Sequence, residues 1–196
     1  MLRDRGTAFL WRVVLPALLV GSGTGLGAEV ALQRPQVVSL KAGLFCPGAP
    51  EEIHQAPDTY KGERHMIPGL HEALVVETFR IPMEYGATLG VIVELAPWFD
   101  YFDATMVLEH PAMGSDGRTR QVAEIPLVSG AANVHAYGLN HAYEMLPGLW
   151  RLSGQSGGMT IYEVVFEVVH PDSVPELAGL CRKDLLSAVP VRRQAG

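Results

Sequence analysis

The sequence predicts a mainly β protein, an immunoglobulin-like β-sandwich of about seven short strands followed by one short C-terminal helix. Three observations support this fold class. Several segments alternate apolar and polar side chains with period two, the pattern of a sheet with one buried face. The 21 glycines and 14 prolines suit many short elements joined by turns. Helical patterns do not alternate with the strands, which disfavours a parallel α/β fold and leaves a small barrel as the main alternative.

The N-terminal 28 residues have the features of a secretory signal peptide. Arg3 and Arg5 precede an uninterrupted apolar run at 13–20, and small residues follow it. This run is shorter than the roughly 20 apolar residues of a transmembrane helix, and Arg12 lies directly before it. We therefore expect cleavage within 25–28, a periplasmic or secreted location, and no stable membrane insertion after cleavage.

Composition and charge set the class of the remaining chain. With 48% hydrophobic and 18% charged residues, it is typical of a globular protein, and we expect one domain over 29–189 and a disordered tail over 190–196. The formal net charge is −6, and it becomes more negative when the signal segment leaves with three arginines and one aspartate. An acidic surface repels phosphate backbones, so nucleic acid is excluded as a partner.

The strands are expected in a regular succession separated by turns. A long irregular excursion at 48–69 interrupts them after the first strand, because prolines, glycines and charges occur there without sustained period. The expected strands cover 37–45, 73–81, 88–95, 104–111, 119–125, 133–137, 149–153 and 159–169.

The Pro147-Gly148 pair predicts a structural corner. Proline presets the backbone angle of a turn and glycine relieves its sterics, so the chain reverses and restarts as a strand that buries Trp150. In the last strand, alternate residues from Tyr162 to Val168 are apolar and Glu163 and Glu167 lie on the other face. We expect the hairpin of these two strands to form a large part of the core.

A change of period after the last strand predicts a helix from about Val174 to Leu186. Ser173 and Glu176 have the spacing of a capping box at its start. The apolar stripe of this helix includes Cys181, which would face the sheet and Cys46. Because an oxidising compartment favours pairing of two cysteines, we expect a disulfide between Cys46 and Cys181, with two buried free thiols as the alternative.

Several short motifs, in this order and spacing, resemble a bacterial family of domains of unknown function, number 3859. They are GLFCP (43–47), APDTYKG (56–62), LGV (89–91), EHPAMGSDGRT (109–119), YEMLPGLW (143–150), FEVV (166–169) and the closing Cys181. The resemblance spans about residues 44–181. It implies an exported, β-rich domain without an assigned activity, and it transfers no catalytic residues to this chain.

Motifs that could carry catalysis or metal binding are weak. Residues 154–158 have the letters of a nucleophile elbow around Ser156, but a strand rather than a helix is expected to follow, which indicates a hairpin turn. The nearest histidines, His135 and His141, lack the spacing of a helical zinc pair, and we expect structural or surface roles for them. Asp100 and Asp103 are interpreted as solvated loop acids. We therefore expect no cofactor, no metal and no catalytic residue.

The loop at 96–104 is the candidate binding patch. Trp98, Phe99, Tyr101 and Phe102 gather there between two expected strands, where exposed rings could grip a sugar, a lipid or a protein. The alternative is that the rings fold back over the core. The hypothesis is that at least two of the rings are exposed and bind a partner.

These observations favour a binding or accessory module of the bacterial cell envelope, without catalytic activity, that contacts a protein or another envelope component. The alternative is a hydrolase acting on an envelope polymer, which a deep polar cleft with converging acids or histidines would favour. A purely structural role is the third hypothesis.

Overall fold

A computed structural model describes residues 27–182 of the chain. The expected signal segment, apart from its last two residues, and the expected tail at 190–196 lie outside the described residues. Within residues 27–182, no helix has both the length and the apolar character needed to cross a membrane.

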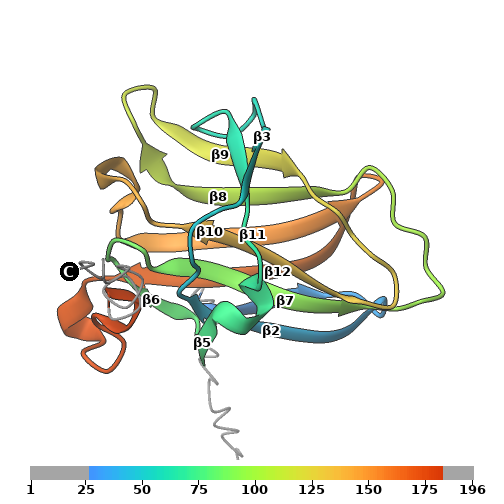
Figure 1. Ribbon diagram of the computed structural model, residues 1–196, viewed down its shortest axis with the longest axis horizontal. Helices are drawn as coiled ribbons and strands as arrows, with labels where there is room; N and C mark the ends of the chain where they lie inside the picture. Colours follow the sequence, from blue (N-terminus) through green and yellow to red (C-terminus); the bar gives the residue numbers. More distant parts are fainter. Residues whose placement is uncertain (1–26, 183–196) are drawn as a thin grey trace, which may run out of the picture.

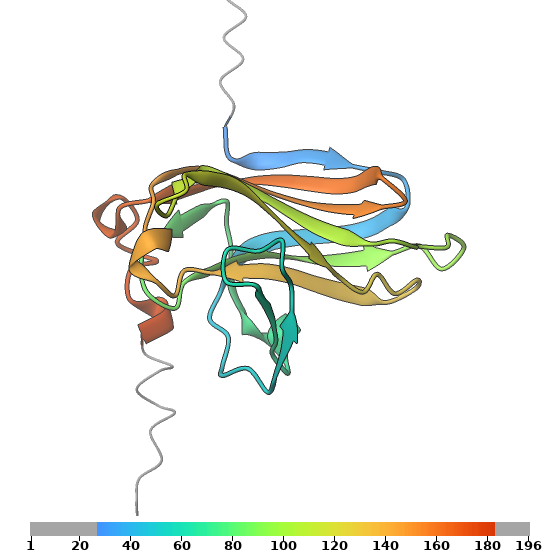
Figure 2. The ribbon, with the colours of Figure 1, turned by 90° about the horizontal axis from the view of Figure 1, so that it is seen from above.

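Two layers of β-sheet form the body of the molecule (Figures 1 and 2). The first sheet has the strand order β1-β12-β11-β8-β9, with β6 pairing parallel to β12 beyond the end of β1. Its strands are β1 (Glu29–Gln33), β6 (Arg80–Pro82), β8 (Thr105–Met113), β9 (Arg118–Glu124), β11 (Gly148–Ser156) and β12 (Met159–Val169). The second sheet has the order β10-β7-β2-β5. Its strands are β2 (Val37–Phe45), β5 (Leu74–Glu77), β7 (Thr88–Leu95) and β10 (Ala132–Gly138).

The core lies between the two sheets and consists of the alternating side chains that the sequence places on one face. In β7, Leu89, Val91, Val93 and Leu95, which alternate along one face of the strand, are fully buried. In β12, the predicted face is buried throughout, and it pairs with β11 over the whole length of the hairpin. The largest fully buried side chains are Trp150, Tyr162, Phe45 and Phe166. Each buried apolar side chain contributes roughly 1.5 to 3 kcal/mol, so the immunoglobulin-like sandwich is stabilised mainly by this layer.

The predicted corner at Pro147-Gly148 is confirmed. Gly148 has a φ of 132°, which favours glycine, and β11 begins there. Trp150 is fully buried, and its indole Nε1 donates a hydrogen bond to the carbonyl oxygen of Leu146 at 3.1 Å. The ring therefore anchors the corner against the core.

The expected single strand at 73–81 is instead two strands in different sheets. β5 pairs with β2 in the second sheet, whereas β6 pairs with β12 in the first. The Thr78 hydroxyl produces the break, because it accepts a hydrogen bond from the Arg80 amide at 3.1 Å and donates one to the Arg80 carbonyl at 3.3 Å. The chain thus crosses from one layer to the other at this point.

Part of the excursion at 48–69 is regular, although the sequence predicts irregular structure there. β3 (Glu52–Gln55) and β4 (Glu63–Met66) form a two-stranded hairpin, and a 3-10 turn, η1 (Leu70–Ala73), follows it. Most of the hairpin side chains are exposed, so they lack the apolar alternation that reveals a buried strand. β1, an exposed edge strand, was missed for the same reason.

The helix predicted from Val174 is wrong over its first half. After a 3-10 turn, η3 (Pro171–Ser173), residues 175–179 form turns. In this segment, α-helical structure begins at 180 and is described as far as 182. Pro175 disfavours the helical conformation at Val174, and Gly179 has a left-handed φ of 74°. Val174, Leu177 and Cys181, which belong to the expected apolar stripe, are nevertheless buried against the core.

The predicted disulfide is confirmed. Cys46 and Cys181 are bonded, with their Cα atoms 4.9 Å apart. The bond ties the residue after β2 to the C-terminal segment, across a sequence separation of 135 residues. Cys181 is buried, so the link forms part of the core rather than of the surface.

Candidate functional site

The predicted aromatic patch lies on the loop between β7 and β8, at one end of the sandwich (Figure 2). We call residues 96–104 the aromatic loop. Trp98 is 76% exposed and Phe102 is 62% exposed, whereas Phe99 and Tyr101 are half-buried. The rings of Phe99 and Tyr101 pack against each other, with centroids 4.9 Å apart. Two of the four rings therefore face solvent, and the other two hold the loop together.

Hydrogen bonds fix the base of the aromatic loop to the neighbouring turns. Ser156 Oγ accepts from the Phe102 amide at 3.0 Å and donates to the Phe102 carbonyl at 2.9 Å. That carbonyl also accepts from the Gly157 amide at 2.9 Å. On the other side, Ser129 donates to the Phe99 carbonyl at 2.7 Å, and the Tyr101 hydroxyl donates to the carbonyl of Gln36 at 3.2 Å. Burial raises the pKa of Tyr101, so its hydroxyl stays a donor. The exposed rings thus stand on a fixed support.

These contacts also explain Ser156. The Ser156 side chain is buried, and its hydroxyl is hydrogen-bonded to both the amide and the carbonyl of Phe102. The β11–β12 hairpin turn follows it. As predicted, a strand rather than a helix comes next. A nucleophile requires an exposed hydroxyl beside a base, so the role of Ser156 is to hold the aromatic loop.

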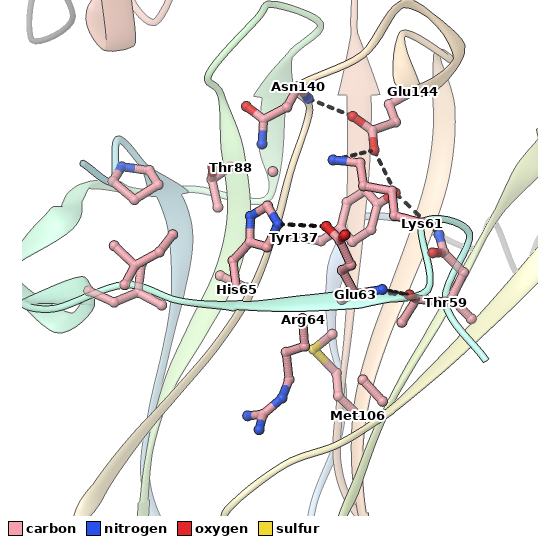
Figure 3. A pocket seen from close by; sticks show the side chains of 17 residues that line it. Thr59, Lys61, Glu63, Arg64, His65, Thr88, Met106, Tyr137, Asn140 and Glu144 are labelled. Atoms are coloured by element: carbon pink, nitrogen blue, oxygen red, sulfur yellow. Dashed lines mark hydrogen bonds and ion pairs between the residues drawn. The ribbon is translucent and has the colours of Figure 1, made fainter. Parts of the chain in front are cut away.

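A polar cleft, which the sequence did not indicate, lies beside β9 and β10 under the β3–β4 hairpin (Figure 3). Its volume is about 140 Å³. Side chains from β4, β8, β9 and β10 line it together with residues of the excursion and of the turn after β10. The hairpin therefore covers the mouth between the outer strands of the two sheets.

Glu144, in the 3-10 turn η2 (Ala142–Glu144), is the most buried charged side chain of the cleft, with 1% exposure. Its Oε2 accepts from the amides of Asn140 at 2.6 Å and His141 at 2.7 Å. Its Oε1 accepts from the Tyr137 hydroxyl at 2.9 Å and lies 3.8 Å from Lys61 Nζ. Three hydrogen-bond donors and the nearby ammonium of Lys61 thus compensate the cost of burying this carboxylate.

A chain of hydrogen bonds continues from Tyr137 into the core. Gln121 Nε2 lies 3.2 Å from the Tyr137 hydroxyl and 3.0 Å from His110 Nε2, while Gln121 Oε1 accepts from the Tyr60 amide at 2.7 Å. Burial, together with the Glu144 charge, raises the pKa of Tyr137. Burial also lowers the pKa of His110, which favours its neutral form as an acceptor from Gln121. The network links the hairpin excursion to both sheets.

The remaining candidate side chains are not brought together. His135 is buried between the sheets, where its Nδ1 bonds the Tyr162 hydroxyl, whereas His141 is exposed and stacks on Tyr143. Asp100 and Asp103 are exposed on the aromatic loop. Within residues 27–182, no three histidine, cysteine or acidic side chains gather as a metal site would require.

The fold and these sites define the class of protein: a disulfide-linked, immunoglobulin-like β-sandwich with an exposed aromatic loop and a separate polar cleft. The family model described as a domain of unknown function (DUF3859) matches residues 33–168, and the chain belongs to this family. An immunoglobulin-like protein of Pseudomonas aeruginosa, known from a crystal structure, is similar at 22% identity, with a TM-score of 0.44 over 74% of this chain and 100% of that one. A comparison with curated proteins found no match.

Proposed function

We propose that the protein is an exported accessory domain of the bacterial cell envelope, without catalytic activity, which binds a protein or another envelope component through the aromatic loop. The observation that carries this proposal is the exposure of Trp98 and Phe102 on a loop that hydrogen bonds hold in place. Tryptophan is enriched among the residues that dominate binding energy, and a fixed loop loses little conformational entropy on binding.

A neighbouring apolar residue extends the patch. Val128, in the loop between β9 and β10, is 54% exposed, and the adjacent Ser129 is bonded to the aromatic loop. Together the three side chains of Trp98, Phe102 and Val128 present apolar surface from two loops at one end of the sandwich. Exposed apolar groups that gather in this way tend to mark contact sites.

Two features support export. The sequence begins with the features of a signal peptide, and the disulfide between Cys46 and Cys181 is of the kind that persists in oxidising compartments. A periplasmic or secreted domain is the simplest assignment that accounts for both.

The polar cleft does not favour the alternative of a hydrolase. A catalytic acid must exchange a proton with substrate, but both oxygens of Glu144 are already engaged, and two of the donors are backbone amides. Within residues 27–182, no hydrogen bond joins the Ser156 hydroxyl to a basic side chain, and the backbone of Phe102 holds it. Binding is therefore the function that the side-chain geometry supports best.

The proposal is tested by affinity capture from a cell-envelope extract, with the protein expressed from its full sequence. We expect a reproducible partner that the Trp98→Ala/Phe102→Ala double variant loses. The matched control is Tyr85→Ala/Leu149→Ala, which removes two exposed apolar side chains elsewhere, 52% and 41% exposed. Capture that is equal for all three proteins, or lost equally in both variants, would contradict the role of the aromatic loop.

A further inference from the structure

We propose that the polar cleft is a second binding site, which takes a small organic monocarboxylate with a short apolar chain and holds its carboxylate at Lys61. This inference stands apart from the proposed function, because the cleft shares no residue with the aromatic loop.

The size and walls of the cleft define the apolar part of the ligand. A volume of about 140 Å³ is close to that of engineered cavities of roughly 150 Å³ that bind benzene. The apolar lining comes from Met106, Ala123, Ala136 and Ile67, which surround the cleft from β8, β9, β10 and the residue after β4. A chain of a few carbon atoms would bury most of its surface against this lining.

Lys61 defines the polar end. Its side chain is 26% exposed, and its ammonium lies 3.8 Å from Glu144 Oε1, too far for a short charge-assisted hydrogen bond. Glu144 itself is satisfied by shorter bonds from two amides and a hydroxyl. The ammonium therefore keeps donors that nothing in the described structure fully engages. Figure 3 shows Asn140 and Thr88 across the cleft from Lys61.

Two other charged groups of the cleft contact neighbouring side chains of their own strand, β4. Glu63 lies 3.5 Å from His65 Nε2, and an Arg64 guanidinium nitrogen lies 3.4 Å from the sulfur of Met66. Leaving the histidine out of the sum, the four charged lining residues Lys61, Arg64, Glu63 and Glu144 balance one another formally. The cleft therefore offers a ligand the incompletely engaged N–H donors of Lys61 rather than a large net charge.

This donor set selects the class of ligand. A carboxylate supplies strong acceptors for Lys61 and a single negative charge, which gives charge-assisted hydrogen bonds. An ammonium group would meet the like charge of Lys61, and a hydroxyl would offer only neutral acceptors. A dianionic phosphate would bring two negative charges into a formally neutral cleft beside Glu63 and Glu144, whereas a monocarboxylate brings one. A monocarboxylate fits both the donors and the apolar walls.

The test compares three six-carbon probes of similar shape, hexanoate, hexanol and hexylamine, by NMR titration of the isotope-labelled protein expressed from its full sequence. We expect hexanoate to shift the amide signals of residues 59–65 and 136–144 saturably, at least tenfold more tightly than hexanol, and hexylamine not to bind. Equal affinities for the three probes, or hexanoate shifts confined to other regions, would overturn the proposal.

Variants of Lys61 and Ala123 test separately how the charge and the shape of the cleft contribute to binding. Lys61→Met should weaken hexanoate binding at least tenfold, whereas Lys61→Arg should retain it, and Lys41→Met, at an exposed ion pair with Glu77, should leave it unchanged. Ala123→Met should block the cleft without a change of charge. Thermal unfolding of each variant establishes that it is folded. Hexanoate binding that survives both Lys61→Met and Ala123→Met in folded protein would place the ligand elsewhere and refute the site.

Discussion

The imidazole of His135 and the hydroxyl of Tyr162 form a buried hydrogen bond that joins β10 of one sheet to β12 of the other. The two rings are stacked, with an interplanar angle of 8° and centroids 5.9 Å apart. The other ring nitrogen of His135 lies 3.3 Å from the Pro126 carbonyl. Neutral histidine satisfies both contacts when Nε2 carries the proton and Nδ1 accepts from the tyrosine, and burial favours this neutral form.

This relationship predicts a loss of stability in mild acid. Burial lowers the pKa of His135 from 6.5 to about 4. The unfolded chain therefore binds the proton first as the pH falls, so the stabilisation is complete above pH 6.5 and is lost progressively towards pH 4. At 1.36 kcal/mol per pKa unit, the loss from this group is at most about 3 kcal/mol. Urea unfolding at a series of pH values measures it.

His135→Gln provides the control, because it removes the titrating group. The variant is expected to be less stable than the parent at pH 7 but to lose less free energy of unfolding between pH 6.5 and pH 4. Burial also lowers the pKa of His110, which contributes in the same direction in both proteins. If the two proteins lost equal stability over this range, His135 would not be the source of the effect.

The strands with strict alternation were predicted to the residue, whereas elements without that pattern were not. β2, β7 and β12 have the predicted bounds, and in β7 and β12 one face is apolar and buried at every second residue. The crossing at Thr78 was not predicted, because nothing in the residues on either side of it shows that β5 and β6 pair in different sheets. The apolar spacing predicts a helix from Val174, but Pro175 disfavours helical backbone at Val174, so the helical residues begin at 180.

The two candidate sites also differ in how far the sequence predicts them. The aromatic loop is visible in the sequence, because its four rings are consecutive or nearly so between two strands. The cleft depends on contacts between residues far apart in the chain, such as Gln121 with the Tyr60 amide at 2.7 Å. The carboxylate of Glu144 is satisfied largely by backbone donors, which no side-chain pattern reveals. One signal in the sequence is available: Glu144 follows His141 by three residues, which is the spacing of a capping box and indicates a local role.

Replacement of Glu144 by glutamine should destabilise the fold. The amide keeps one acceptor oxygen but places an NH₂ group among donors, so at least one buried donor loses its partner. We expect a loss of about 1 to 3 kcal/mol in the free energy of unfolding. The matched control is Glu124→Gln, an exposed position where the effect should stay below about 0.5 kcal/mol. Denaturant unfolding that showed equal stability for both variants would contradict the structural role of Glu144.

The disulfide is expected to contribute strongly to stability. Cys46→Ala/Cys181→Ala frees the C-terminal segment from the end of β2 and enlarges the unfolded ensemble. The expected loss is about 2 to 5 kcal/mol in the free energy of unfolding. A reducing agent should lower the unfolding midpoint of the parent towards that of the variant and leave the variant unchanged. Peptide mapping without reduction should recover Cys46 linked to Cys181; recovery of both as free thiols would refute the pairing.

The turn between β11 and β12 offers a matched pair of glycines that tests the support of the aromatic loop. Gly157 and Gly158 both have left-handed φ angles, 54° and 76°, so alanine costs roughly 1 kcal/mol of backbone strain at either position. A Cβ atom on Gly157 would lie 2.7 Å from the Phe102 ring, whereas one on Gly158 would have no atom within 4 Å. Gly157→Ala should therefore displace Phe102, and Gly158→Ala should not.

NMR spectra of the two alanine variants distinguish the strain from the displacement. Both should show a similar loss of stability from the backbone, but only Gly157→Ala should shift the amide signals of residues 98–103. In the same variant, capture of a partner by the aromatic loop should weaken, because Phe102 no longer rests on the hairpin turn that holds its carbonyl. Equal shifts in both variants would show that the turn, rather than its contact with Phe102, determines the conformation of the loop.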